Sequence, residues 1–235
     1  MCQLLGIGAN RPVDMRLSLR EFRHRGAVNS HGWGFAFREG RSWRVIKRPV
    51  SLAGENTGDG RFDFTSPIVI GHVRLATCGN HTHPNTHPFA LGKWAFAHNG
   101  TVEGIMGHPD FRLARRFPKG GTDSEYAFCR LVEAIEEAGG APEEAIAREA
   151  ARIRAHGRFN FLLSDGKRLY AHGHDSLFCA ERSAPFPGVR LVDDGYEADL
   201  AEIKARDERA VIIATEPLTE GEEWTRIEGL RVFGW

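Results

Sequence analysis

The sequence predicts an α+β fold in which mostly antiparallel sheets carry helices on their outer faces. Short apolar or alternating segments, which are typical of strands, outnumber the segments with helical periodicity. They follow one another in hairpin-like groups and do not alternate regularly with helices, which favours antiparallel pairing. The predicted strands cover residues 2–8, 33–37, 43–47, 67–75, 94–98, 158–164, 168–172, 177–181, 210–214 and 230–234.

The helical segments are fewer, and the clearest one begins at Thr122. Thr122 and Glu125 have the spacing of a capping box ahead of an apolar stripe, and the helix should end near Gly139. A second helix should start at Pro142, because proline suits the first helical turn. A shorter helix is expected over residues 14–24.

Composition limits the kind of protein. With 235 residues and 41% hydrophobic composition, the chain can bury one large core, so we expect a single domain. Lys plus Arg equals Asp plus Glu at 31 each, so no net field favours a nucleic acid or an anionic membrane as partner. There is no apolar run long enough to span a membrane and no leader segment, which predicts a cytoplasmic protein.

Cysteine at position 2 can act as a nucleophile at the amino terminus. A small second residue permits removal of Met1, which leaves the Cys2 thiol and a free α-amine on one residue. That amine has a pKa of about 7.7 to 8.0, so it can accept the thiol proton near neutral pH. The alternative is an ordinary buried strand cysteine. Cys78 and Cys129 are expected to be structural, and the absence of a CxxC pair favours reduced thiols.

Asn99 and Gly100 end an apolar run abruptly, and the pair has two interpretations. Asn-Gly between apolar runs is a strong hairpin signal, since both residues tolerate positive φ. The asparagine side-chain amide and the glycine N–H could also bind the oxyanion of a tetrahedral intermediate.

Arg74 and Asp123 could bind a charged ligand together. Arg74 lies in an apolar strand, where its guanidinium needs either a structural carboxylate or the carboxylate of a substrate. Asp123 lies in the first turn of the helix capped by Thr122, where the helix dipole favours a carboxylate even without a function. In one pocket, the two side chains would bind both charged ends of a free amino acid.

The ordered segments of the chain resemble the glutaminase domain of class II glutamine amidotransferases, which are N-terminal nucleophile hydrolases. The segment HGWGFAF resembles the small stand-alone bacterial members, and the match is close over about the first 130 residues. The segments are MCQLLG at 1–6, HGWGFAF at 31–37, GHVRLAT at 71–77, NTHPF at 85–89, AHNG at 97–100 and TDSE at 122–125.

The resemblance implies a four-layer αββα sandwich, no cofactor and a specific set of site residues. Cys2 would be the nucleophile and would form a γ-glutamyl thioester, and Asn99 and Gly100 would form the oxyanion hole. Arg74, with Thr77 nearby, would bind the substrate α-carboxylate, and Asp123 would bind its α-ammonium group. Many synthase-linked members have tryptophan and histidine where this chain has Leu75 and Cys78.

The implied function is cleavage of the γ-amide of glutamine or of a γ-glutamyl compound. Because the chain ends at Trp235, we expect one amidotransferase domain over residues 1–235 without a synthase domain. The chain would then be a self-sufficient hydrolase, or a glutaminase subunit that supplies ammonia to a separate synthase. A metal-dependent hydrolase or a non-catalytic binding protein is the remaining alternative. It rests on histidines that could line one pocket, although they lack the spacing of a known metal motif: His72, His81, His83, His87 and His98.

Overall fold

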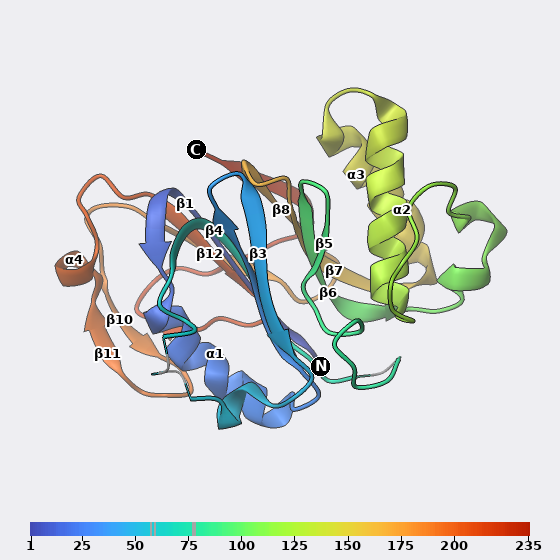
Figure 1. The fold of residues 1–235 in the computed structure, drawn as a ribbon. Coiled ribbons are helices and arrows are strands. Elements are labelled where there is room, and N and C mark those ends of the chain that lie inside the picture. The colour runs from blue at the N-terminus through green and yellow to red at the C-terminus, as the bar shows by residue number, and fades with distance from the viewer. Residues whose placement is uncertain (57, 59, 77–78) are drawn as a thin grey trace.

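The computed structural model describes residues 1–56, 58, 60–76 and 79–235, and two large antiparallel sheets dominate it (Figure 1). Every strand pair among these residues is antiparallel. Helices lie on the outer faces of the two sheets, so the molecule has the order helix, sheet, sheet, helix. The α+β class that the sequence pattern predicts and the αββα sandwich that the family resemblance implies are both confirmed.

The larger sheet has seven strands, with β1 at its centre. β1 pairs with β4 on one side and with β12 on the other. The strand order is β14 (Thr225–Arg226), β9 (Phe178–Arg182), β12 (Ala210–Ala214), β1 (Gln3–Asp14), β4 (Thr65–Val73), β2 (Trp33–Glu39) and β3 (Ser42–Arg48).

The second sheet has five strands, and a small third sheet has three. The five strands are β15 (Gly229–Gly234), β8 (Arg168–Gly173), β7 (Gly157–Ser164), β6 (Trp94–Val102) and β5 (Phe89–Leu91). The small sheet consists of β11 (Glu197–Asp199), β10 (Gly188–Leu191) and β13 (Thr219–Glu220).

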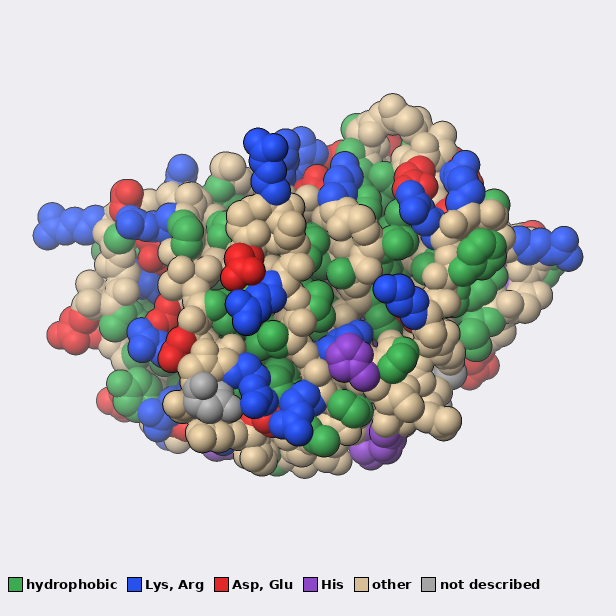
Figure 2. All heavy atoms as spheres, viewed as in Figure 1, with side chains coloured by type: hydrophobic (Ala, Val, Ile, Leu, Met, Phe, Trp, Pro, Cys, Tyr) green, Lys and Arg blue, Asp and Glu red, His purple; other side chains and the backbone are tan. Residues whose placement is uncertain are grey.

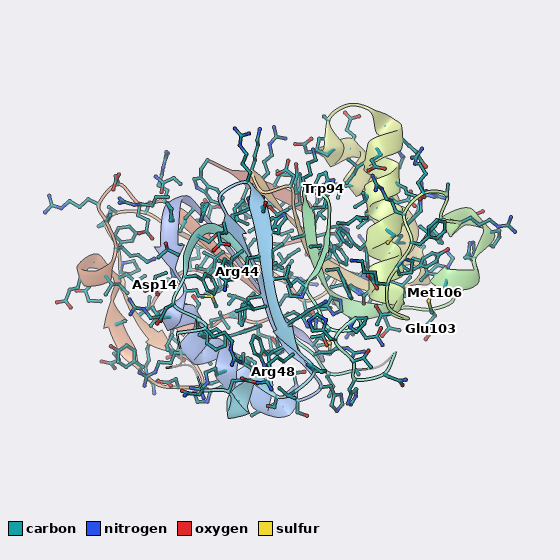
Figure 3. The ribbon with its side chains drawn as sticks, viewed as in Figure 1. Asp14, Arg44, Arg48, Trp94, Glu103 and Met106 are labelled. Atoms are coloured by element: carbon teal, nitrogen blue, oxygen red, sulfur yellow. The ribbon has the colours of Figure 1, made fainter. Side chains whose placement is uncertain are left out.

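Each large sheet has its own helical cover. α1 (Arg16–Val28) packs on the seven-stranded sheet through Leu19 and Phe22. α2 (Asp123–Ala138) and α3 (Pro142–Ile153) pack together on the five-stranded sheet, where the Phe128 ring stacks on Phe96. Trp94 begins β6 and belongs to the same apolar cluster (Figure 3). The remaining helices are short: η1 (Leu52–Gly54), η2 (Ile105–Gly107), η3 (Pro109–Phe111), η4 (Arg154–His156) and α4 (Leu200–Ile203).

A third apolar cluster fills the space between the sheets. Alternation along β4 sends Ile68 and Ile70 into this cluster, while Val69 and Val73 face the layer that contains α1. Burial of each isoleucine side chain stabilises the fold by roughly 1.5–3 kcal/mol. The period-two pattern therefore fixes which face of β4 meets the other sheet.

The predicted elements are found, with differences at their ends and among the short strands. α2 and α3 start where predicted, whereas α1 covers residues 16–28 and extends past the expected end at residue 24. Five short strands were not predicted from the sequence: β5, β10, β11, β13 and β14. They have two to four residues each, which is too short for a periodic pattern.

The surface fits the balanced charge of the chain. Figure 2 shows basic and acidic side chains intermingled over one face of the molecule. No helix within the described residues is long and apolar enough to cross a membrane.

Candidate active site

Cys2 lies immediately before β1, at the end of the central strand of the seven-stranded sheet. Its Sγ donates to the Leu75 carbonyl oxygen and accepts from the Leu75 N–H, each at 3.3 Å. Burial raises the pKa of the Cys2 thiol above 9.0, although the Leu75 hydrogen bond and the positive charge of Arg74 oppose this shift. At neutral pH the thiol therefore keeps its proton and needs a base before it can attack a carbonyl.

Arg74 follows directly after β4 and is 3% exposed. Its backbone N–H donates to the Gly32 carbonyl oxygen at 2.7 Å. Its guanidinium donates to the backbone oxygens of Gly79 and Asn80, each at 3.3 Å. These contacts orient the guanidinium, and a guanidinium is a suitable partner for a carboxylate.

Asn99 and Gly100 lie inside β6, where they pair with Asn160 and Phe159 of β7. The hairpin interpretation of Asn-Gly is therefore wrong, because the chain continues as a strand to residue 102. The Asn99 side-chain amide donates to Thr215 Oγ1 at 3.3 Å and is held in one orientation. The oxyanion interpretation stays open, since it requires two fixed donors and not a turn.

Asp123 is the first residue of α2. Its Oδ2 accepts from the Val102 N–H at 2.7 Å, which ties the helix to the end of β6. Thr122 caps the helix as predicted, because its Oγ1 accepts from the Glu125 N–H at 3.2 Å. The other half of the predicted capping box is not formed, since the Glu125 carboxylate accepts from the Gly120 N–H at 2.7 Å.

These segments, distant in sequence, meet at one small cavity of about 20 Å³. Two predicted site residues are not among the residues that line this cavity. Asn99 is next to Gly100 in β6, and Thr77 lies outside the described residues. The cavity is lined by Cys2, Arg74, His87, His98, Gly100, Thr122, Asp123 and Ser124. The structure thus brings together the predicted nucleophile, both predicted charged groups and one predicted oxyanion donor.

Sequence analysis missed the structural use of the histidines at this site. His98 Nδ1 lies 2.8 Å from Ser124 Oγ, and its Nε2 lies 3.0 Å from the Arg158 carbonyl oxygen, so the ring joins α2 to β7. The rings of His72 and His87 stack with centroids 4.2 Å apart. Side chains alternate along β4, and this alternation places His72 inside the molecule. The pattern in the sequence could therefore have identified His72 as a buried residue.

These histidines are held neutral by burial. Burial lowers the pKa of His72 to about 3 and the pKa of His87 well below 6.5. Burial also lowers the pKa of His98, although the charge of Asp123 opposes it. Both ring nitrogens of His87 lack a hydrogen-bond partner among the described residues.

The other two histidines of the metal hypothesis are on the surface. His81 and His83 are exposed, and the His81 ring stacks on His31. Within the described part of the chain, no group of three or more His, Cys, Asp or Glu side chains is arranged to hold a metal ion. Cys129 and Cys179 are buried and form no disulfide.

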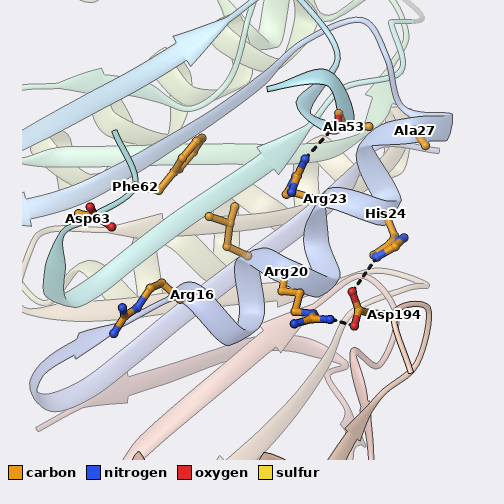
Figure 4. Close-up of a pocket in the computed structure, with 10 residues that line it drawn as sticks. Arg16, Arg20, Arg23, His24, Ala27, Ala53, Phe62, Asp63 and Asp194 are labelled. Carbon is orange, nitrogen blue, oxygen red and sulfur yellow. Dashed lines mark hydrogen bonds and ion pairs between the residues drawn. The ribbon is translucent and has the colours of Figure 1, made fainter. Parts of the chain in front are cut away.

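A larger cavity of about 620 Å³ lies along α1 (Figure 4), and Cys2 is not among its lining residues. Several of its charged groups already have partners. Arg20 and His24 both contact the Asp194 carboxylate, at 2.7 and 3.2 Å, and Arg23 donates to the Ala53 carbonyl oxygen. The cavity is lined by Arg16, Leu19, Arg20, Arg23, His24, Ala27, Ala53, Phe62, Asp63 and Asp194. These ion pairs fasten α1 to the neighbouring loops, and none of the predicted site residues lies there.

Two antiparallel sheets packed between helices form the αββα sandwich that the resemblance to N-terminal nucleophile hydrolases implies, and Cys2 lies at the end of the central strand. A solved structure from Pseudomonas aeruginosa, described as a predicted glutamine amidotransferase, has this fold. It is 31% identical, with a TM-score of 0.71 over 99% of this chain and 97% of that one.

Sequence comparison identifies the family. The family model for class II glutamine amidotransferases matches residues 1–233. The Escherichia coli protein named "Putative glutamine amidotransferase YafJ" is 33% identical over 97% of this chain and 94% of its own length. A Haemophilus influenzae protein with the same description is 35% identical over 97% of this chain and 82% of its own length. The chain belongs to the class II glutamine amidotransferases, a family that cleaves the amide of glutamine.

Proposed function

We propose that this chain is a self-sufficient hydrolase of the γ-amide of glutamine or of a γ-glutamyl compound. Residues 1–235 would form one amidotransferase domain, and Cys2 would be the nucleophile after removal of Met1. The observation that carries the proposal is that Cys2, Arg74, Gly100 and Asp123 line one cavity. An anion binder and a cation binder beside a thiol suit a substrate with both charges of a free amino acid.

The proposed roles divide between binding of the substrate and stabilisation of the reaction intermediate. The Arg74 guanidinium binds the substrate α-carboxylate, with Thr77 as a further contact that the family resemblance implies. The Asp123 carboxylate binds the α-ammonium group. The Asn99 side-chain amide and the Gly100 N–H donate to the oxyanion.

The reaction proceeds in two displacements. The freed α-amine of Cys2 takes the thiol proton while Sγ attacks the γ-carbonyl carbon. The tetrahedral intermediate collapses, the C–N bond breaks, and the amine returns the proton to the departing nitrogen. Water then attacks the γ-glutamyl thioester, which releases glutamate and restores the thiol. This scheme needs no cofactor.

The first test combines intact mass with covalent labelling. Purified protein is treated with a glutamine analogue that carries an electrophile at the γ position, followed by peptide mapping. We expect loss of Met1 and one adduct on Cys2, and we expect the isolated protein to release ammonia from glutamine.

Two alanine variants complete the test. Cys2→Ala should abolish labelling and turnover, whereas Cys129→Ala should keep both. Cys129 is a suitable control because burial, together with Glu125 and Glu133, raises the pKa of its thiol to about 12. Full turnover by Cys2→Ala, or no adduct on the wild-type chain, contradicts the proposal.

A further inference from the structure

An ion pair faces Met1 beside the candidate site. Arg158, on β7, contacts Met1 Sδ through Nη1, and its Nε lies 2.6 Å from Asp175 Oδ2. The two side chains are 42% and 36% exposed, so a small molecule can reach them. An ion pair this exposed contributes little to the stability of the fold. Stability alone therefore does not explain why the two side chains are held together here.

Asp175 is held by a fully buried asparagine. The Asn160 side-chain amide donates to Asp175 Oδ1 at 2.8 Å and to the Asn99 carbonyl oxygen at 3.2 Å. Its Oδ1 accepts the N–H groups of His174 and Asp175, at 2.7 and 3.1 Å. Asn160 thus forms a rigid link between the proposed oxyanion residue Asn99 and the carboxylate that orients Arg158.

The backbone of Arg158 is fixed next to the proposed oxyanion hole. Arg158 pairs with Thr101 in the β6–β7 register, one position from Gly100. Its carbonyl oxygen accepts from His98 and would lie 1.9 Å from a Cβ added at Gly100. The Arg158 side chain therefore starts beside the reacting centre and extends toward Met1.

The position of Met1 indicates where the departing part of a substrate would lie. In the proposed reaction the Cys2 amine gives its proton to the leaving nitrogen, so the leaving group lies on the amine side. Met1 is attached to the same nitrogen atom. The covalent path from that nitrogen runs through the Met1 carbonyl carbon, Cα, Cβ and Cγ to Sδ, which contacts Arg158. A departing amino acid would be hydrogen-bonded to the Cys2 amine through its nitrogen. From there its Cα and carboxyl carbon would place its carboxylate oxygens about as far from the amine as Met1 Sδ is.

We propose that Arg158 binds the α-carboxylate of the leaving group, and that the preferred substrates are γ-glutamyl amino acids. This inference rests on the proposed function and narrows its substrate class. Water and a γ-glutamyl amino acid give glutamate and a free amino acid. The γ C–N bond breaks, the hydroxyl of water stays on glutamate, and a proton goes to the leaving nitrogen. Asp175 acts as a positioning residue through Arg158.

The test compares two substrates that differ in the leaving-group carboxylate: γ-glutamylglycine and γ-glutamylglycinamide. Glutamate release gives kcat/KM for each. We expect the wild-type protein to prefer γ-glutamylglycine by about tenfold, the size of one charge-assisted hydrogen bond. Arg158→Gln should remove this preference, and Arg158→Lys should keep part of it. Asp175→Asn should raise KM for γ-glutamylglycine more than KM for the amide.

Arg168→Gln is the matched control, since Arg168 is also half exposed and ion-paired, to Glu143, on neighbouring β8. Its ratio of kcat/KM values should equal that of the wild type. If the wild type and Arg158→Gln have the same ratio of kcat/KM for γ-glutamylglycine to kcat/KM for γ-glutamylglycinamide, this inference is overturned and the proposed function stands. No Cys2 adduct and no turnover of glutamine or either substrate by the wild-type protein overturns both.

Discussion

At Gly100 the backbones of β6 and β7 approach so closely that a side chain has no room. A Cβ there would lie 1.9 Å from the Arg158 carbonyl oxygen and 2.7 Å from His98 Nε2. The sequence pattern offered a tight turn or an oxyanion donor as the reason for this glycine, whereas the structure shows that the close approach of two strands requires it. The strand partner of Gly100 is Phe159, 59 positions later in the chain, and a partner so distant leaves no local signal in the sequence.

Gly100→Ala should therefore damage both the fold and the reaction. The new methyl group must push β7 or His98 away, which we expect to lower the free energy of unfolding by about 2 kcal/mol or more. Turnover should fall at least about 100-fold if the Gly100 N–H is an oxyanion donor. Urea unfolding and glutamate release measure the two effects.

The matched variant Gly107→Ala lies in open space at a negative φ. It should change stability by less than about 0.5 kcal/mol and leave turnover unchanged. A Gly100→Ala protein with wild-type stability and turnover would contradict the close-approach argument.

At the scale of single elements, α2 links a helix cap to the proposed substrate site. Thr122 caps the helix, and the next residue, Asp123, is the proposed ammonium binder. The start of this helix was predictable because its cap and its apolar stripe are local in sequence. The contact of Asp123 with Val102 joins α2 to β6, and a pattern within one helix carries no information about it.

Thr122→Ala should lower the free energy of unfolding by about 1 kcal/mol, because the Glu125 N–H loses its acceptor. Fraying of the first turn also moves Asp123, so KM for glutamine should rise more than kcat falls. Thermal unfolding and steady-state kinetics provide the two measurements. Thr122→Ser keeps the hydroxyl and should behave like the wild type, whereas equal effects of alanine and serine would exclude the cap as the cause.

At the scale of the whole molecule, a buried ion pair fastens the small sheet to the large one. Arg182 on β9 and Glu222, just after β13, are 4% and 5% exposed and contact each other at 2.5 Å. Burial raises the pKa of Glu222, but the Arg182 hydrogen bonds and charge outweigh this effect and hold it below 4.5. The folded state therefore binds fewer protons than the unfolded state near this pH. The stabilisation is present above about pH 4.5 and is lost as the pH falls through the lowered pKa.

Glu222→Gln should cost about 3–5 kcal/mol at pH 7, since it leaves Arg182 buried without its counter-charge. The difference from wild type should shrink as the pH falls below 4.5, where the native carboxylate becomes protonated. Urea unfolding from pH 7 down to pH 3 measures this convergence. Glu220→Gln removes the exposed partner of Arg190 and should change stability by less than about 1 kcal/mol. A constant difference at all pH values would show that the charge of Glu222 is not the cause.

The layers of the molecule were predictable because the alternation of side chains along the strands and the apolar stripes of the helices indicate which faces are buried. The order of the motifs predicted a set of candidate residues, and the structure brings Cys2, Arg74, Gly100 and Asp123 of that set to one cavity, while their roles stay predictions. The hydrogen bonds of Asn160 and the packing of the buried histidines could not be predicted, because each depends on which strands become neighbours in the folded sheets. Strand order follows from the packing of the complete chain and not from any one segment.

The central place of β1 also orders events during synthesis. β1 is made first, yet its pairing is complete when β12, at residues 210–214, has been made. At about 5–20 residues per second, the first strand waits on the order of 10–40 s for this neighbour. Under the proposed processing, an aminopeptidase would therefore remove Met1 from an unpaired end, before the sheet closes on Cys2. The same interval leaves the Cys2 thiol open to oxidants, so slow folding would expose the proposed nucleophile to damage before it meets a substrate.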